Sequence, residues 1–161
     1  MFRSIQITFA LTLCGAAYAG ESNEQEVKVS ELPPAITASV QSHYPGATIR
    51  EASRETYEGK DTWEAGITTA GRKLDLAFQP DGTLVEEEEV IDASALPAVV
   101  KAAIAKQMPG ATATKAERSV ALGKTRYEVM LKTSGKSSEV VFDDGGTIVK
   151  STAEDEDGEK K

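Results

Sequence analysis

Residues 32–47 of the chain read LPPAITASVQSHYPGA, and residues 96–111 read LPAVVKAAIAKQMPGA. Both stretches start with Leu-Pro, continue with an apolar pattern of helical period and end with Pro-Gly-Ala, 64 positions apart. The same offset relates many residues downstream: Gly59 to Gly123, Trp63 to Tyr127, Gly71 to Gly135, Phe78 to Phe142 and Gly82 to Gly146. A fixed offset sustained over this length indicates an internal duplication. The chain is therefore predicted to contain two copies of one unit.

Each copy is expected to begin with a helix. Apolar residues recur at every fourth position, the spacing of one helical face: Leu32, Ile36, Val40 and Tyr44 in the first copy, and Leu96, Val100, Ile104 and Met108 in the second. Ser30 and Ser94 are the expected N-caps, and Pro33 suits the first turn because its missing N–H would have no helical partner there. The Pro-Gly pair after each stripe should end the helix.

Strands are expected after each helix, because the apolar period changes from about four to two. The alternating residues are Trp63, Ala65, Ile67, Leu74, Leu76 and Phe78 in the first copy, and Tyr127, Val129, Leu131, Val140 and Phe142 in the second. The predicted fold class is α+β: two tandem repeats, each one helix followed by a roughly four-stranded antiparallel sheet. A unit of about 64 residues has a marginal core by itself, so the repeats should pack as one compact body.

The N-terminus carries the pattern of an export signal. Arg3 gives a positive start, residues 5–13 are mostly apolar, and the run Ala17-Tyr18-Ala19 offers a cleavage site. Cleavage after Ala19 would make the protein periplasmic or secreted, and the apolar run is too short to remain as a transmembrane segment. A second possibility stays open, because the residues before Cys14 resemble a lipoprotein processing site, although Leu13 stands where a small residue is expected.

The chain is predicted to comprise a signal peptide at 1–19, a flexible leader at 20–26, repeat 1 at 27–90, repeat 2 at 91–152 and an acidic disordered tail at 153–161. The formal net charge is −8, with acidic runs at 86–89 and 154–157. Acidic chains repel nucleic acid and anionic lipid, so neither is an expected partner. The acidic runs are interpreted mainly as solvated charge that keeps a small protein soluble.

No catalytic constellation is visible in the sequence. His43 is the single histidine, and its counterpart in the second copy is Gln107. A zinc site would need several His or Cys ligands. The aspartates at Asp81, Asp143 and Asp144 lack the spacing of a calcium loop, and hairpin turns explain them more simply. The protein is therefore expected not to be an enzyme and to have no catalytic residues, metal site or cofactor.

These elements together resemble the PepSY-like family of exported bacterial domains, which is described as similar to β-lactamase inhibitor protein. The likeness lies in the Leu-Pro before each helix, the Pro-Gly-Ala after it, the aromatic-Glu pair at a strand centre and the Phe-x-x-x-Gly at the final hairpin. It covers residues 27–151. The resemblance implies a tandem of helix-plus-four-strand units whose sheets can form a concave binding face, and it assigns no activity.

The strand alternation predicts which side chains point away from the helices. Trp63 and Tyr127 are in phase with aliphatic residues and should pack under the helices. The opposite phase holds Thr62, Glu64, Thr68, Lys73, Asp75, Arg126, Glu128, Met130, Lys132, Glu139 and Val141. This mixture of charge with a few apolar groups suits a protein or peptide contact, although a plain solvated sheet face fits it equally well. The candidate binding residues are Glu64, Asp75, Glu128, Met130 and Glu139.

Two functions are compatible with this sequence. The first is an exported non-catalytic binding module of the bacterial cell envelope, which inhibits or senses an exported protein through the uncovered sheet face. The alternative is a periplasmic protein that binds a small molecule or a divalent cation, for which the acidic runs are the support.

Overall fold

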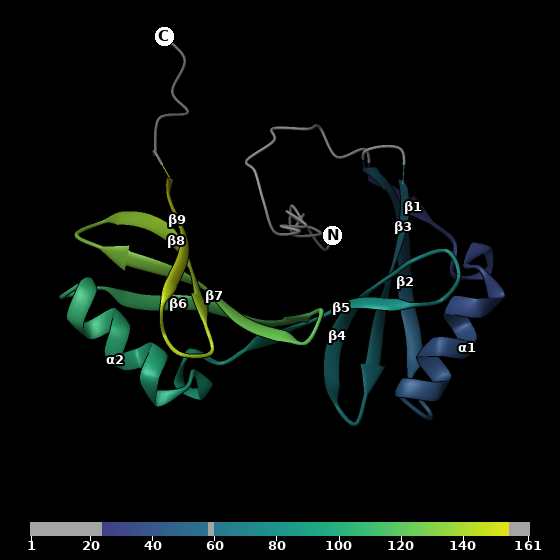
Figure 1. Ribbon diagram of the computed structural model, residues 1–161, viewed down its shortest axis with the longest axis horizontal. Coiled ribbons are helices and arrows are strands. Elements are labelled where there is room, and N and C mark those ends of the chain that lie inside the picture. The colour runs from purple at the N-terminus through teal and green to yellow at the C-terminus, as the bar shows by residue number, and fades with distance from the viewer. Residues whose placement is uncertain (1–23, 58–59, 155–161) are drawn as a thin grey trace, which may run out of the picture.

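The computed structural model of the protein describes residues 24–57 and 60–154 (Figure 1). The predicted signal peptide and its cleavage site lie outside these residues, as does the predicted tail beyond residue 154. The elements in chain order are β1 Gln25–Val27, η1 Val29–Glu31, α1 Pro34–His43, β2 Thr48–Tyr57, β3 Lys60–Thr69, β4 Arg72–Phe78, β5 Leu84–Ile91, η2 Ala93–Ala95, α2 Ala98–Gln107, β6 Thr112–Ala121, β7 Lys124–Thr133, β8 Lys136–Asp143 and β9 Ile148–Glu154, where η marks a 3₁₀ helix. None of the described helices is long and apolar enough to cross a membrane.

The strands form one antiparallel sheet of nine strands, arranged in sequence order from β1 to β9. The α+β class is confirmed. The expectation of a separate, roughly four-stranded sheet in each repeat is wrong, because β5 is hydrogen bonded on both edges. Leu76 of β4 lies opposite Glu87 of β5, and Glu87 lies opposite Val120 of β6. The last strand of the first repeat therefore continues the sheet into the second.

Both helices lie on the same face of this sheet. Directly opposite residues of antiparallel neighbours point to one face, so Leu76, Glu87 and Val120 share a face. Ile91, four positions beyond Glu87, lies on that face as well. Leu76 belongs to the core under α1, and Ile91 packs against the core under α2. Figure 1 shows α1 and α2 at opposite ends of the molecule. No described helix covers the other face, which we call the open face.

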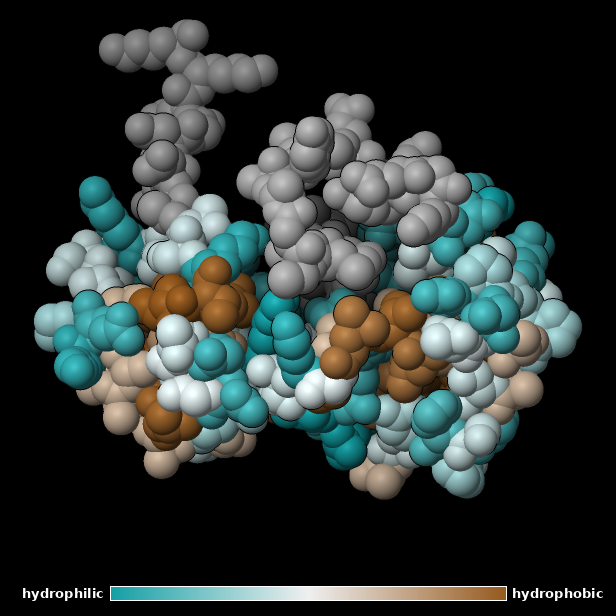
Figure 2. Space-filling view, in the orientation of Figure 1, coloured by the Kyte–Doolittle hydropathy of each residue, from teal (hydrophilic) through white to brown (hydrophobic). Residues whose placement is uncertain are grey.

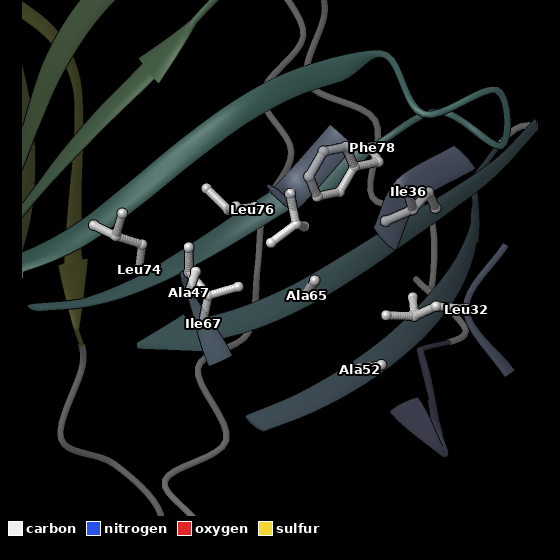
Figure 3. Close-up of a cluster of buried hydrophobic side chains, with 10 residues drawn as sticks. Leu32, Ile36, Ala47, Ala52, Ala65, Ile67, Leu74, Leu76 and Phe78 are labelled. Carbon is white, nitrogen blue, oxygen red and sulfur yellow. The ribbon is translucent and has the colours of Figure 1, made fainter. Parts of the chain in front are cut away.

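Two separate hydrophobic clusters hold the helices on the sheet. Under α1 the buried residues are Leu32, Ile36, Val40, Ala47, Ala52, Ala65, Ile67, Leu74, Leu76 and Phe78 (Figure 3). Under α2 they are Leu96, Val100, Ile104, Ala116, Val129, Leu131, Val140 and Phe142. Phe78 and Phe142 are the largest fully buried side chains. Trp63 and Tyr127 pack against these clusters, as predicted, but remain partly exposed. The guanidinium of Arg54 lies 5.6 Å from the centroid of the Trp63 ring.

The two predicted N-cap serines do not cap the helices. Ser30 and Ser94 lie in η1 and η2, and the caps of α1 and α2 are Pro33 and Pro97. The physical reason is that the Leu-Pro segment is extended and separates each serine from the helix that follows. Ser94 instead donates its backbone N–H to the side chain of Asp92 at 2.7 Å, which caps η2.

The sheet extends further at both ends than the sequence indicates. β1 includes Gln25 and Glu26, which were expected in the flexible leader, and they pair with Arg54 and Ser53. β9 reaches Glu154, within the predicted tail. A three-residue strand and a charged strand end carry too little apolar alternation to be recognised.

A glycine sets how closely each final hairpin approaches its helix. A Cβ added at Gly82 would lie 2.6 Å from the carbonyl oxygen of Ala35 in α1, and one added at Gly146 would lie 2.9 Å from that of Val99 in α2. Both distances are shorter than van der Waals contact, and the obstructing atoms belong to helix backbone. The Phe-x-x-x-Gly pattern of each repeat is therefore a packing requirement of the hairpin against the helix.

Gly82→Ala is expected to destabilise the protein more than Gly135→Ala. Both glycines have φ of +87°, but a Cβ at Gly135 would meet no atom within 4 Å. The control substitution therefore introduces only backbone strain of about 1–2 kcal/mol, whereas Gly82→Ala adds a clash with the backbone of α1. Urea unfolding of the two variants measures the difference. Equal losses of stability would show that the close approach has no energetic consequence.

Candidate functional site

A bulge and a glycine shape the open face in the first repeat. The register of β2 against β3 shifts between Ile49 and Glu51, so Arg50 and Glu51 both reach the open face. Gly66 of β3 leaves the space that they fill, because a Cβ there would lie 2.6 Å from Cγ of Glu51. Arg50 extends across β3, and its Nη2 lies 3.6 Å from Oδ1 of Asp75 on β4.

The five predicted binding residues all lie on the open face, in two groups. Glu64 of β3 and Asp75 of β4 form the first group and repel each other electrostatically. Glu128 and Met130 of β7 form the second group with Glu139 of β8, which lies directly opposite Met130. Two strands, β5 and β6, separate the groups. Their placement agrees with the alternation in the sequence, and their role in binding stays a prediction.

Three further carboxylates, which the apolar alternation does not reveal, connect these groups. Glu88 of β5 lies directly opposite Asp75, and Glu117 of β6 lies directly opposite Glu128. Glu86, two residues before Glu88, is on the same face. We call the whole set the acidic row: Glu64, Asp75, Glu86, Glu88, Glu117, Glu128 and Glu139. The available signal was the apolar start and end of β5, Leu84 and Ile91, which mark the acidic run as part of a strand. They do not assign its glutamates to faces, because both pack on the helix side although they are seven positions apart.

The centre of the acidic row holds protons strongly. Burial raises the pKa of Glu88 to about 9, and repulsion by four carboxylates on the same face, those of Glu86, Glu117, Glu128 and Glu64, adds to the rise. Burial is also the main cause of the raised pKa values of Asp75, Glu86 and Glu128. These groups are partly shielded from solvent and lie close to like charges, so protonation stabilises them.

Glu64 marks the edge of the row in the first repeat. Burial raises its pKa to about 7, and repulsion by Glu24, Glu55 and Asp75 contributes in the same direction. The hydroxyl of Ser53 donates a hydrogen bond to Oε2 of Glu64 at 3.1 Å, which opposes the rise. Glu64 is therefore close to half-protonated near neutral pH.

The opposite face of β5 carries compensated charges. Nη2 of Arg118 lies 2.5 Å from Oε1 of Glu87 and 3.4 Å from Oε2 of Glu89. Arg72 binds both carboxylate oxygens of Glu89, at 2.7 and 2.6 Å. Tyr44, at the end of α1, donates a hydrogen bond to Glu87. Burial, followed by this hydrogen bond, raises the pKa of Tyr44, and the hydrogen bond from Arg72 lowers that of Glu89. These five residues, the junction network, link the two repeats.

The open face presents acceptors on an ordered sheet. Within residues 24–57 and 60–154, no group of three or more His, Cys, Asp or Glu residues is arranged to hold a metal ion. His43 is exposed at the end of α1, with its ring centroid 6.4 Å from that of Tyr44. Figure 2 shows hydrophobic residues in two areas, one on each half of the molecule, with hydrophilic residues between them. The carboxylates of the open face suit contact with a partner that carries positive charge.

Comparison with known proteins gives one family and several similar folds. The family model described as "Putative beta-lactamase-inhibitor-like, PepSY-like" matches residues 19–86 and 61–150. A BLIP-like protein from Bacteroides fragilis NCTC 9343 is 20% identical with a TM-score of 0.61, and the match covers 74% of this chain and 84% of that one. No curated protein matches the chain.

Two further solved structures share the fold. One comes from Bacteroides eggerthii DSM 20697 and is described among "putative periplasmic proteins"; the other is a DUF2874 family protein from Bacteroides uniformis ATCC 8492. Each is 14% identical with a TM-score of 0.63, and each match covers 75% of this chain and 88% of the other. At these identities the likeness establishes the fold.

Arg118→Met is expected to lower the free energy of unfolding by about 1–3 kcal/mol, because it leaves Glu87 and Glu89 half-buried without the arginine they share. Lys150→Met is the control. The ammonium of Lys150 lies 3.7 Å from Glu139, and its side chain is 44% exposed, so its loss should change stability by less than about 1 kcal/mol. Chemical denaturation measures both variants. A loss for Arg118→Met no larger than the control would show that the junction network contributes little.

Proposed function

The chain belongs to the PepSY-like family, and we propose that it is an exported, non-catalytic binding module of the bacterial cell envelope. The partner is a protein or peptide with a basic surface, which the open face contacts in order to inhibit or sense it. The family description names a likeness to an inhibitor of β-lactamase, and an inhibitor of that kind acts by contact. The match of the family over both repeats supports this class of function.

The single observation that carries the proposal is the acidic row. Its carboxylates lie on the face of a continuous sheet that no described helix covers, and two hydrophobic cores hold the other face. An ordered surface loses little conformational entropy on association, so it can bind without a pocket. Carboxylates that repel one another and are partly shielded from solvent should attract a cationic partner more strongly than fully solvated carboxylates. Glu64 and Glu128, at equivalent positions of the two repeats, would be central contacts, with Asp75, Met130 and Glu139 around them.

Export is supported by the N-terminal pattern and by the description of a structural neighbour as periplasmic. The positive start, the apolar run and Ala17-Tyr18-Ala19 fit a cleaved signal peptide. The mature protein would then begin at Gly20 and lie in the periplasm or outside the cell. Intact mass measurement of the protein recovered from the envelope tests the cleavage, because acylation at Cys14 would give a longer, lipid-bearing species instead.

A divalent cation is the second candidate ligand, and the directly opposed carboxyls of the acidic row are the observation that favours it. Hard cations prefer carboxylate oxygens. Thermal unfolding with and without millimolar Ca²⁺ or Mg²⁺ separates the candidates, because a ligand that binds the folded state raises its melting temperature. A rise abolished by Glu88→Gln and Glu117→Gln would favour the cation over the protein partner.

The protein-binding proposal is tested by charge reversal. A partner captured from envelope extract is identified, purified and titrated against the protein and its Glu64→Lys, Glu128→Lys variant. We expect affinity to fall at least about tenfold, equivalent to about 1.4 kcal/mol, and to depend less on salt. The melting temperature should not fall, because each lysine replaces a carboxylate that is repelled by its neighbours.

The matched control is Asp144→Lys against Glu128→Lys alone. Both change the charge equally, but Asp144 lies exposed in the turn before β9. Loss of affinity in Glu128→Lys and not in Asp144→Lys would assign the contact to the open face. Full affinity in the double variant would place the contact surface elsewhere and contradict the proposal.

A further inference from the structure

The acidic row crosses the strand that joins the two repeats. Glu88, at the middle of β5, lies directly opposite Asp75 on β4, and on the other side β6 and β7 bring Glu117 directly opposite Glu128. Like charges directly opposite each other destabilise an antiparallel pair. One such pair joins β4 and β5, and the other joins β6 and β7, so the two pairs are adjacent in the sheet. β5 is the only described strand that connects the repeats.

Glu88 has little to compensate its charge. It makes no hydrogen bond or salt bridge to another described residue. Its face of the sheet carries further charged groups on every strand. They are Glu26 on β1, Arg50, Glu51 and Glu55 on β2, Glu64 on β3, Lys73 and Asp75 on β4, Glu86 on β5, Lys115 and Glu117 on β6, Lys124, Arg126, Glu128 and Lys132 on β7, Glu139 and Asp143 on β8, and Lys150 on β9. Three of the cations contact other carboxylates: Arg50 contacts Glu51 and Asp75, Lys115 lies 3.1 Å from Glu117, and Lys150 lies 3.7 Å from Glu139. Lys73 lowers the pKa of Asp75. Arg126 lowers the pKa of Glu86.

The two hydrophobic cores do not hold the repeats together, so that role falls to the pairing of β5. The cluster under α1 and the cluster under α2 are separate. On the helix face of β5 the contacts between the repeats are the polar ones of the junction network. The free energy that holds one repeat on the other therefore resides largely in backbone pairing of β5 and in charges on its two faces, which leaves the junction sensitive to the state of those charges.

We propose that the carboxyl cluster around Glu88 is a pH-sensitive switch on the pairing of the two repeats. When the cluster holds protons, β5 pairs firmly with β4 and β6. When it loses them, repulsion between facing carboxylates loosens the junction and frees the repeats to move relative to each other. The inference does not depend on the identity of a partner, and it can be tested on the protein alone.

The direction of the pH dependence follows from linkage. The pKa of Glu88 is raised from 4.5 to about 9 in the folded protein, and that of Glu64 to about 7. Between the ordinary and the raised pKa values the folded state binds more protons than the unfolded state, so stability falls as pH rises through this window. Glu89 acts in the opposite sense, because its lowered pKa contributes stability that is lost as pH falls below its ordinary value. Stability should therefore peak on the acidic side of neutrality.

Urea unfolding of the purified protein at pH 5, 7 and 9 tests the switch. The wild-type midpoint is expected to fall from pH 5 to pH 9. Glu88→Gln, which keeps the shape and removes the charge, should have a higher midpoint than wild type at pH 9 and a flatter profile. Asp144→Asn, an exposed turn carboxyl outside the row, should follow the wild type. A wild-type midpoint that is flat or rising from pH 5 to 9 would overturn the proposal, as would parallel profiles for wild type and Glu88→Gln.

Hydrogen exchange locates the change. Protection of the β5 amides, corrected for the intrinsic effect of pH, should fall between pH 6 and pH 9 by more than that of the β3 amides under α1. Uniform loss of protection over both strands would show global destabilisation and contradict a switch at the junction. Should Glu88→Gln fail to fold, Glu64→Gln serves as the second variant, and its gain over wild type should develop around pH 7 rather than pH 9. No gain in that variant would also overturn the proposal.

Discussion

Pairing of β5 on both edges is the constraint on which the rest of the structure depends. Two repeats of about 64 residues would each have a marginal core, and their two clusters do not merge. The sheet instead runs unbroken from β4 through β5 to β6. Both helices are thereby fixed to one face, and the other face becomes a single surface that spans the molecule. The open face exists as one site only because this strand is shared.

The four consecutive glutamates of β5 serve two different purposes because a strand sends alternate side chains to opposite faces. Glu87 and Glu89 meet Arg118, Arg72 and Tyr44, and their charges are compensated. Glu88 meets mainly other carboxyls, and burial, together with their repulsion, raises its pKa to about 9. Glu86 lies on the same face, where burial raises its pKa and Arg126 and Ser119 oppose the rise. One face of the junction therefore contributes stability at neutral pH while the other opposes it. A short strand of consecutive glutamates can thus connect two repeats and also make the stability of their pairing depend on pH.

The repeat, the helices, most strands and the open-face position of Glu64 and Glu128 could be predicted, because periodicity in apolar residues reports directly on faces. The role of residues 86–89 could not, since four identical glutamates carry no hydropathy alternation and resemble a solvated run. β5 and β6 belong to different repeats. The hydropathy pattern within one repeat therefore does not show that these two strands pair. Ser30 and Ser94 have the residue type and place of N-caps, but the extended Leu-Pro segment that follows each of them moves the helix start to Pro33 and Pro97, and composition alone does not reveal that boundary.

The registers show that β5 belongs to both repeats. Val27 of β1 lies opposite Ala52, and Ile91 of β5 lies opposite Ala116, 64 positions further along in each case. β1 is therefore the counterpart of the last residues of β5, while β9, which starts at Ile148, is the counterpart of the residues from Leu84 onward. The predicted boundary between residues 90 and 91 falls inside this shared strand. β6 of the second repeat pairs almost entirely with residues that belong to the first, Glu86 to Val90. Removing the first repeat would therefore leave β6 unpaired and open a sheet edge along the acidic row, and removing the second would expose the outer edge of β5.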